Sequence, residues 1–173
     1  MNTKRLTSKE YFKTLQIIHL ALLAGPVFFG VVTFVLNRSG KLNSGSNELR
    51  DIFIYIVPLF VIGGIFIGHS LFNSMLRTAK SLGNLSDKMN GYRSALIIRY
   101  ALLEGPAYFA IVVYFLTGDL LFLAMAGLII LIFLTIKPTP GKASKDLNLN
   151  LNDKQSIDDP NKVIAEMIVV KSN

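Results

Sequence analysis

Four long apolar stretches limit what this chain can fold into more than any other feature. They run from residues 15 to 36, 52 to 72, 95 to 116 and 120 to 136. An α-helix rises about 1.5 Å per residue and the hydrocarbon core of a bilayer is about 30 Å thick, so about 20 apolar residues span it. The pattern predicts an all-α membrane protein with a bundle of four transmembrane helices.

The breaks between the stretches predict how the spans are connected. Thr117-Gly118-Asp119 separates the third stretch from the fourth, where glycine can end one helix in a left-handed conformation and aspartate can cap the next. Lys137-Pro138-Thr139-Pro140 ends the fourth. We therefore expect a cytoplasmic segment over residues 1–14, a transmembrane domain over 15–137 and a short cytoplasmic tail over 138–173.

The basic residues predict the orientation of the spans. The formal net charge is +7, but Lys and Arg gather at the edges of the apolar stretches, as expected for contact with anionic headgroups and not with nucleic acid. Eleven of them precede the first stretch, lie between the second and third, or follow the fourth as far as Lys145, against three on the other side. The positive-inside rule predicts both termini in the cytoplasm, and we expect a bacterial inner-membrane protein.

An internal repeat relates the first and third stretches. Residues 17–36 align with residues 97–116, and 10 of the 20 aligned positions are identical, among them an Ala-Leu-Leu-x-Gly-Pro motif. These two spans would cross the bilayer in the same direction. We therefore expect two parallel helical-hairpin repeats.

Small residues and prolines in the spans predict close helix packing. A glycine four residues from another small residue lets helix backbones approach, and a proline removes a helical hydrogen bond and can bend the helix. Such packing serves either one bundle or a homo-oligomer. The positions concerned are Gly25, Pro26, Gly64, Gly68, Gly105 and Pro106.

Glu104 is the candidate protonatable residue. It lies near the middle of the third span, where an ionised carboxylate is costly. Tyr100 and Tyr108 are one helical turn away on either side and could donate hydrogen bonds to it. Glu104 would serve either as a proton or cation relay, or as a structural hydrogen-bonding group between helices.

His19 and His69 form a second candidate pair. Each lies in the cytoplasmic half of its span, at similar predicted depth. Two histidines on neighbouring helices are the minimum for axial ligation of a haem. Alternatively, His19 and His69 are separate polar residues near the membrane interface and bind no cofactor. We predict no metal site and no bound cofactor.

The segments outside the spans predict three smaller features. Residues 73–93 carry Leu82, Leu85 and Met89 at helical spacing and suggest an amphipathic piece on the membrane surface. In the tail, Asp159-Pro160 could start a helix over residues 161–170. Alternatively, residues 165–170 form a strand that pairs with residues 147–151, where leucines alternate with asparagines.

These observations leave three hypotheses for function. The chain has no cysteine, no phosphate-binding loop and no nucleophile motif, so we do not expect an enzyme. The first hypothesis is a non-enzymatic subunit or assembly component of a membrane complex. The second is a small transporter or proton-conducting protein that uses Glu104, and the third is a bis-histidine haem protein.

Overall fold

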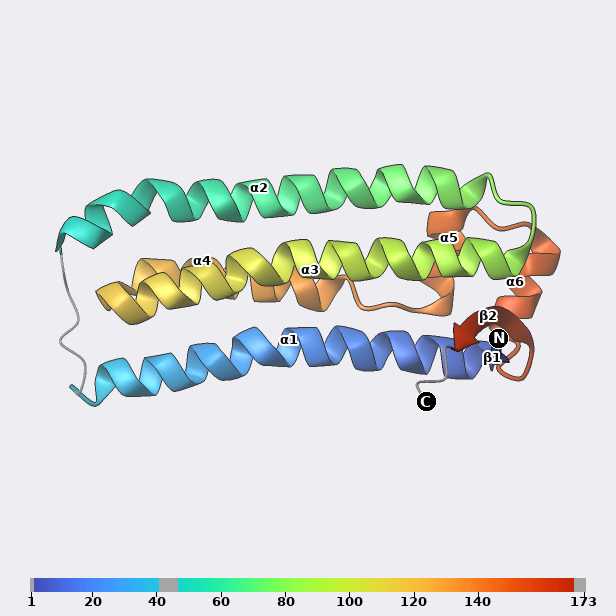
Figure 1. Cartoon of the computed structure of the whole chain (residues 1–173), viewed down its shortest axis with the longest axis horizontal. Coiled ribbons are helices and arrows are strands. Elements are labelled where there is room, and N and C mark those ends of the chain that lie inside the picture. The colour runs from blue at the N-terminus through green and yellow to red at the C-terminus, as the bar shows by residue number, and fades with distance from the viewer. Residues whose placement is uncertain (1, 41–46, 170–173) are drawn as a thin grey trace. The chain divides into compact units, whose positions relative to one another are not determined.

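The structure, a computed structural model, describes residues 2–40 and 47–169 (Figure 1). This part of the chain contains two strands and six helices. In chain order they are β1 (Asn2–Thr7), α1 (Ser8–Arg38), α2 (Asn47–Lys80), α3 (Leu85–Thr117), α4 (Leu120–Thr135), α5 (Pro140–Leu147), α6 (Leu151–Asp158) and β2 (Val163–Val169).

The chain divides into two compact units. Unit 1 takes in residues up to His19, residues 71–98 and the residues from Pro138 onward. Unit 2 is made of residues 20–70 and 99–137. Helices α1, α2 and α3 each contribute residues to both units.

Three to four helices are able to span a bilayer, which indicates an integral membrane protein. Helices α1, α2 and α3 are long and apolar enough on their own, whereas α4 qualifies only together with α5, to which it is bent by 87°. The three long helices have 31, 34 and 33 residues. At about 1.5 Å per residue each exceeds the bilayer core by roughly 15 Å or more, so each helix extends beyond the predicted span that it contains.

Unit 2 has the apolar exterior of a membrane domain. Phe28, Tyr55 and Phe66 each expose more than 70% of their surface, which would be costly in water and is favourable against lipid. Its interior is also apolar, with Ile111, Tyr114, Phe122, Ile129 and Phe133 buried.

Helices α2 and α3 approach closely within unit 2. A Cβ atom added at Gly64 would lie 2.7 Å from the Leu102 carbonyl oxygen, and one added at Gly68 would lie 3.5 Å from the Leu102 Cβ. The Gly64/Gly68 pair therefore packs against α3 of the same chain. That is the packing we expected for one bundle, not for a homo-oligomer face.

Unit 1 brings the first and last described elements together. Strands β1 and β2 pair antiparallel, from Asn2 opposite Val169 to Thr7 opposite Val163 (Figure 1). The unit has a core of buried side chains from five helices and both strands, with Phe72 and Ala79 contributed by α2. Its members include Leu6, Tyr11, Leu15, Met89, Tyr92, Leu147, Ile157 and Ile164.

The small sheet corrects one of the expectations for the tail. The fold is helical as predicted apart from these two short strands, and residues 163–169 form a strand and not the helix predicted over 161–170. Asp159 ends α6, so it does not start a helix. The alternative prediction, a strand over residues 165–170, is confirmed as far as Val169. Val170 lies outside the described residues.

The predicted partner of that strand is wrong. Residues 147–151 do not form a strand, because Asn148 ends α5 in a left-handed conformation and the Asn150 side chain caps α6 by accepting the Asp153 amide. Asparagine favours both positions. The leucine and asparagine alternation therefore reflects two helix ends in succession.

The second connection is also shorter than expected. Helix α2 continues to Lys80 and α3 begins at Leu85, so residues 73–93 contain no separate surface helix. Met89 is fully buried in unit 1.

The predicted ends of α3 and α4 are confirmed. Gly118 has φ of 70°, in the left-handed region, and the Asp119 side chain caps α4 by accepting the Leu121 amide at 2.9 Å. Helix α4 ends at Thr135, shortly before the two prolines, and Thr139 then caps α5.

Candidate functional site

Glu104 lies on α3 where that helix meets α1 in unit 2. Its side chain is half-buried, and its Oε1 would lie 3.8 Å from a Cβ atom added at Gly25. Among the described residues the Glu104 carboxylate has no hydrogen-bond partner. Glu104 is therefore a half-buried carboxylate beside a small residue. It does not form the hydrogen bond between helices that its structural role would require.

Tyr108 fills the space left by the missing side chain of Gly25. Its hydroxyl occupies the position that a Cβ of residue 25 would take, and its ring lies 5.9 Å from that of Phe29. Tyr108 and Glu104 thus both lie against the same turn of α1. The two side chains share one face of α3, as their spacing predicts, but the expected hydrogen bond from the Tyr108 hydroxyl to the Glu104 carboxylate is not formed.

Tyr100 does not complete this group. Its hydroxyl donates to the Ile136 carbonyl at 3.3 Å, and its ring stacks on Phe133 with centroids 5.3 Å apart. A hydroxyl has one proton to donate, so Tyr100 does not donate to Glu104. It instead satisfies a carbonyl at the end of α4, a role that the sequence did not indicate.

The two glycines that the sequence alignment pairs, Gly25 and Gly105, have different surroundings. Gly25 packs against Tyr108, whereas a Cβ added at Gly105 would meet nothing within 4 Å. Pro26 and Pro106 both lie inside their helices. Pro106 packs against Gly64, because a Cβ at residue 64 would lie 2.5 Å from its Cγ.

The histidines lie in different units. His19 belongs to unit 1 and is 5% exposed, whereas His69 belongs to unit 2 and is exposed. Within residues 2–40 and 47–169 no group of three or more His, Asp and Glu side chains is placed to hold a metal ion. The haem hypothesis stays a prediction.

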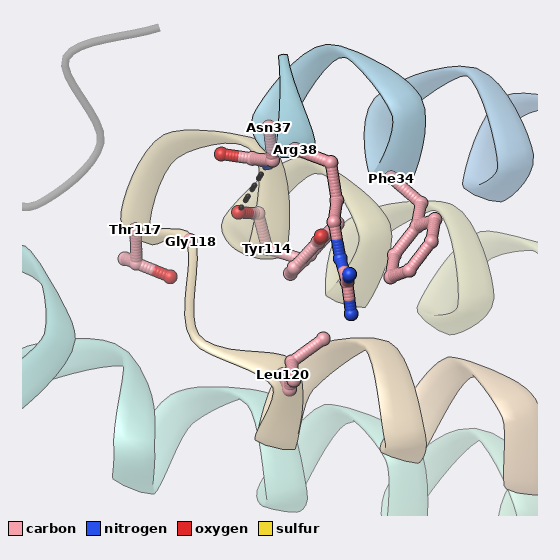
Figure 2. Close-up of a pocket in the computed structure, with 7 residues that line it drawn as sticks. All are labelled: Phe34, Asn37, Arg38, Tyr114, Thr117, Gly118 and Leu120. Atoms are coloured by element: carbon pink, nitrogen blue, oxygen red, sulfur yellow. Dashed lines mark hydrogen bonds between the residues drawn. The ribbon is translucent and has the colours of Figure 1, made fainter. Parts of the chain in front are cut away.

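A polar pocket of about 390 Å³ opens at one end of unit 2, where α1 ends and α3 turns into α4 (Figure 2). Arg38 lies over the Phe34 ring, with 5.2 Å between the guanidinium carbon and the ring centroid. The Asn37 side chain donates to the Tyr114 carbonyl at 3.4 Å. Thr117, Gly118 and Leu120 complete the lining.

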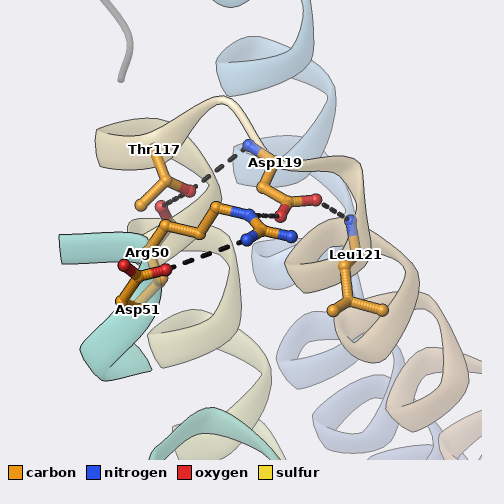
Figure 3. Close-up of polar contacts among 6 residues, drawn as sticks. Arg50, Asp51, Thr117, Asp119 and Leu121 are labelled. Carbon is orange, nitrogen blue, oxygen red and sulfur yellow. Dashed lines mark hydrogen bonds and ion pairs between the residues drawn. The ribbon is translucent and has the colours of Figure 1, made fainter. Parts of the chain in front are cut away.

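An ion pair joins α2 to the cap of α4 at the same turn (Figure 3). The Arg50 Nε donates to Asp119 Oδ2 at 2.7 Å, while Asp119 Oδ1 accepts the Leu121 amide. The Leu121 amide and then the Arg50 guanidinium hold the pKa of Asp119 below its usual range. The Asp51 Oδ1 lies 3.9 Å from the Arg50 Nη1.

The sequence analysis missed both of these features at the end of unit 2. Phe34 and Arg38 are four residues apart, the spacing that places side chains together on a helix, so their contact could have been predicted. Arg50 and Asp119 are 69 residues apart, and no local pattern connects them.

Unit 1 holds its elements together with buried polar contacts. Ser8 donates to the Ile157 carbonyl and Tyr11 to the Met89 carbonyl, each at 2.5 Å. Tyr92 donates to Asp146 at 3.3 Å. Lys88 pairs with Asp153 at 3.3 Å, with both side chains largely buried.

The β2 strand is fastened to α3 by hydrogen bonds outside the sheet. The Glu166 amide donates to the Ser86 hydroxyl at 3.0 Å, and the Asn90 side chain donates to the Glu166 carbonyl at 3.1 Å. The helix thus occupies part of the strand edge that faces away from β1.

Comparison of the chain with models of protein families, with curated proteins and with solved structures finds no match.

Proposed function

We propose that this protein is a non-enzymatic subunit or assembly component of a complex in a bacterial cytoplasmic membrane. It crosses the membrane four times, keeps both ends in the cytoplasm, and offers unit 1 to a partner protein. The observation that carries the proposal is the folding of both ends of the chain and the α2–α3 turn into one polar module.

The membership of unit 1 supports four crossings. Strand β1 precedes α1, residues 71–98 join α2 to α3, and β2 follows α4, yet all three regions share one unit. If α1 crosses the membrane away from unit 1 and α2 crosses back, then α3 crosses away again. The chain reaches the side of unit 1 once more only if α4 also crosses. Three crossings would separate β2 from β1.

The charge of unit 1 supports its placement in the cytoplasm. Its described residues hold twelve Lys and Arg residues, against four in those of unit 2. Two of the four, Arg99 and Lys137, stand next to unit 1 in the sequence. This asymmetry is what the positive-inside rule expects of a cytoplasmic module.

The build of unit 1 supports a role in binding. Its buried hydrogen bonds and the Lys88–Asp153 pair fix one arrangement of the module, which lowers the entropy lost when a partner binds. Leu151 at the start of α6 exposes 78% of its surface and Val163 exposes 45%. Exposed apolar side chains on a polar module are suited to the centre of a protein contact.

Purification of the tagged protein from its native membrane in mild detergent tests the proposal. We expect a partner at a fixed stoichiometry with the unaltered chain, and loss of that partner with Leu151→Asp. Lys154→Gln, on the same helix, is the matched control and should retain it. A chain that elutes alone, or as a homo-oligomer that Leu151→Asp leaves intact, would contradict the proposed role.

A second candidate function is conduction of protons or cations through Glu104. The observation that favours it is the half-buried carboxylate beside Gly25, which has no hydrogen-bond partner among the described residues and is close to the Tyr108 hydroxyl. A carboxylate in a membrane span is costly and is commonly part of an ion pathway.

Flux through purified protein in liposomes tests this candidate. If Glu104 carries protons, Glu104→Gln abolishes a voltage-driven pH change, whereas Glu104→Asp retains part of it because the titrating group remains. Tyr108→Phe removes the hydroxyl beside Gly25 and keeps the ring against Phe29. Equal flux in Glu104→Gln and the unaltered protein would exclude the relay.

A further inference from the structure

An apolar groove lies within unit 2 between α1 and α4, with α3 at its base. It has a volume of about 340 Å³ and is lined mainly by apolar side chains and glycines, among them Pro26, Gly30, Phe34, Ile111, Ala126 and Gly127. The lining positions on α1 run from residue 26 to residue 34, which is about 12 Å of helix. The groove is thus elongated along the helices, as an extended hydrocarbon chain is.

The groove leads to the polar pocket at the end of unit 2. Phe34 lines both cavities, so they lie next to each other at this residue. Beyond Phe34 the lining becomes mixed, with Asn37, Arg38 and Thr117 beside Tyr114 and Leu120 (Figure 2). An apolar groove with a cationic mouth matches an amphiphile with an acyl chain and an anionic headgroup.

The two arginines at this end of unit 2, Arg38 and Arg50, differ in whether an acidic side chain pairs with them. Arg50 is paired with Asp119, whereas Arg38 forms no ion pair with any described residue. The Arg38 guanidinium carbon lies 5.2 Å from the Phe34 ring centroid, a cation–π contact that leaves the positive charge without an anionic partner among the described residues. Arginine donates two parallel hydrogen bonds to phosphate oxygens.

We propose that unit 2 binds one anionic phospholipid of the surrounding bilayer, with an acyl chain in the α1–α4 groove and the headgroup phosphate on Arg38. The site lies wholly within unit 2. It depends neither on a partner of unit 1 nor on proton conduction by Glu104.

Native mass spectrometry of the detergent-solubilised full chain tests the site, with equal amounts of phosphatidylglycerol and phosphatidylethanolamine carrying the same acyl chains. We expect one retained phospholipid per chain, predominantly phosphatidylglycerol. Arg38→Gln should lower the preference for phosphatidylglycerol by about tenfold, the equivalent of losing one charge-assisted contact. Arg50→Gln changes the net charge equally but leaves the mouth arginine, so the preference should persist.

A second pair of variants tests the groove itself. A side chain at Gly127 would enter open space, since nothing lies within 4 Å of its Cβ position, so Gly127→Leu should fold and block the groove. We expect it to retain neither phospholipid. Gly105→Leu also enters open space but lies outside the groove, and it should retain the lipid.

Either of two results would overturn the lipid site. One is equal lipid retention by Gly127→Leu and the unaltered chain, with helix content and elution volume unchanged. The other is an equal fall in phosphatidylglycerol preference for Arg38→Gln and Arg50→Gln, which would indicate attraction by net charge alone.

Discussion

At the scale of single residues, the backbone contact at Gly64 leaves no room for a side chain. A Cβ atom there would meet the Leu102 carbonyl oxygen and Pro106, and a backbone atom cannot rotate away as a side chain can. We expect Gly64→Ala to lower the free energy of unfolding in detergent by about 1–3 kcal/mol, as overpacking does. Thermal unfolding followed by circular dichroism measures this.

The neighbouring glycine supplies the control. Nothing lies within 4 Å of a Cβ at Gly63, and alanine is a better helix former than glycine by about 0.5–1 kcal/mol. Gly63→Ala should therefore leave the unfolding temperature unchanged or raise it. If Gly64→Ala and Gly63→Ala behave alike, α2 and α3 do not pack as closely as described.

At the scale of secondary-structure elements, Asp119 stabilises α4 in two ways that mutation can separate. It caps the helix through the Leu121 amide and pairs with Arg50. Asparagine also caps helices well, so Asp119→Asn removes the charge and keeps the cap, whereas Asp119→Ala removes both. We expect stability at neutral pH to fall in the order unaltered protein, Asp119→Asn, Asp119→Ala.

The lowered pKa of Asp119 predicts how these differences depend on pH. A carboxyl group whose pKa is lower in the folded than in the unfolded state stabilises the fold above the unfolded value, about 3.9 for aspartate. This stabilisation is lost as pH falls through the folded pKa. The gap in unfolding temperature between the unaltered protein and Asp119→Asn should therefore close in acid. A gap that stays constant to pH 2 would show that the charge makes no contribution.

At the scale of the whole molecule, the pairing of β1 with β2 predicts that the two strands lie on the same side of the membrane. The chain has no cysteine, so any disulfide or thiol labelling comes from the introduced cysteines alone. Arg5 and Glu166 are opposite each other across the sheet, within the distance a disulfide can bridge. We expect Arg5→Cys/Glu166→Cys to form an intramolecular disulfide under mild oxidation, and either single variant to form none.

Labelling with a membrane-impermeant thiol reagent completes this test of topology. In intact cells, Gly40→Cys should react and the reduced Glu166→Cys should not, with the reverse in inverted vesicles. Reaction of both cysteines from the same side would contradict the proposed topology, because α1 could then not cross the membrane.

Much of the helical architecture could be predicted from the sequence, because the lengths of apolar runs and the residues that end helices act locally. The three long apolar helices, the left-handed Gly118 and the Asp119 cap required only neighbouring residues. The association of Glu104 with Tyr108 followed from helical periodicity alone. The sequence predicted that a helix packs closely at Gly64 but not which helix, since residue spacing identifies a face of small residues and not the helix that covers it.

Tertiary structure alone decided the features that join distant parts of the chain. The partner of β2 is β1, 156 or more residues away, and the local alternation at residues 147–151 pointed to a wrong partner. The Tyr100 hydroxyl bonds to the end of α4, Arg50 to the α4 cap, and the groove lies between α1 and α4. Each depends on which helices become neighbours, and the sequence determines that only through the packing of the folded units.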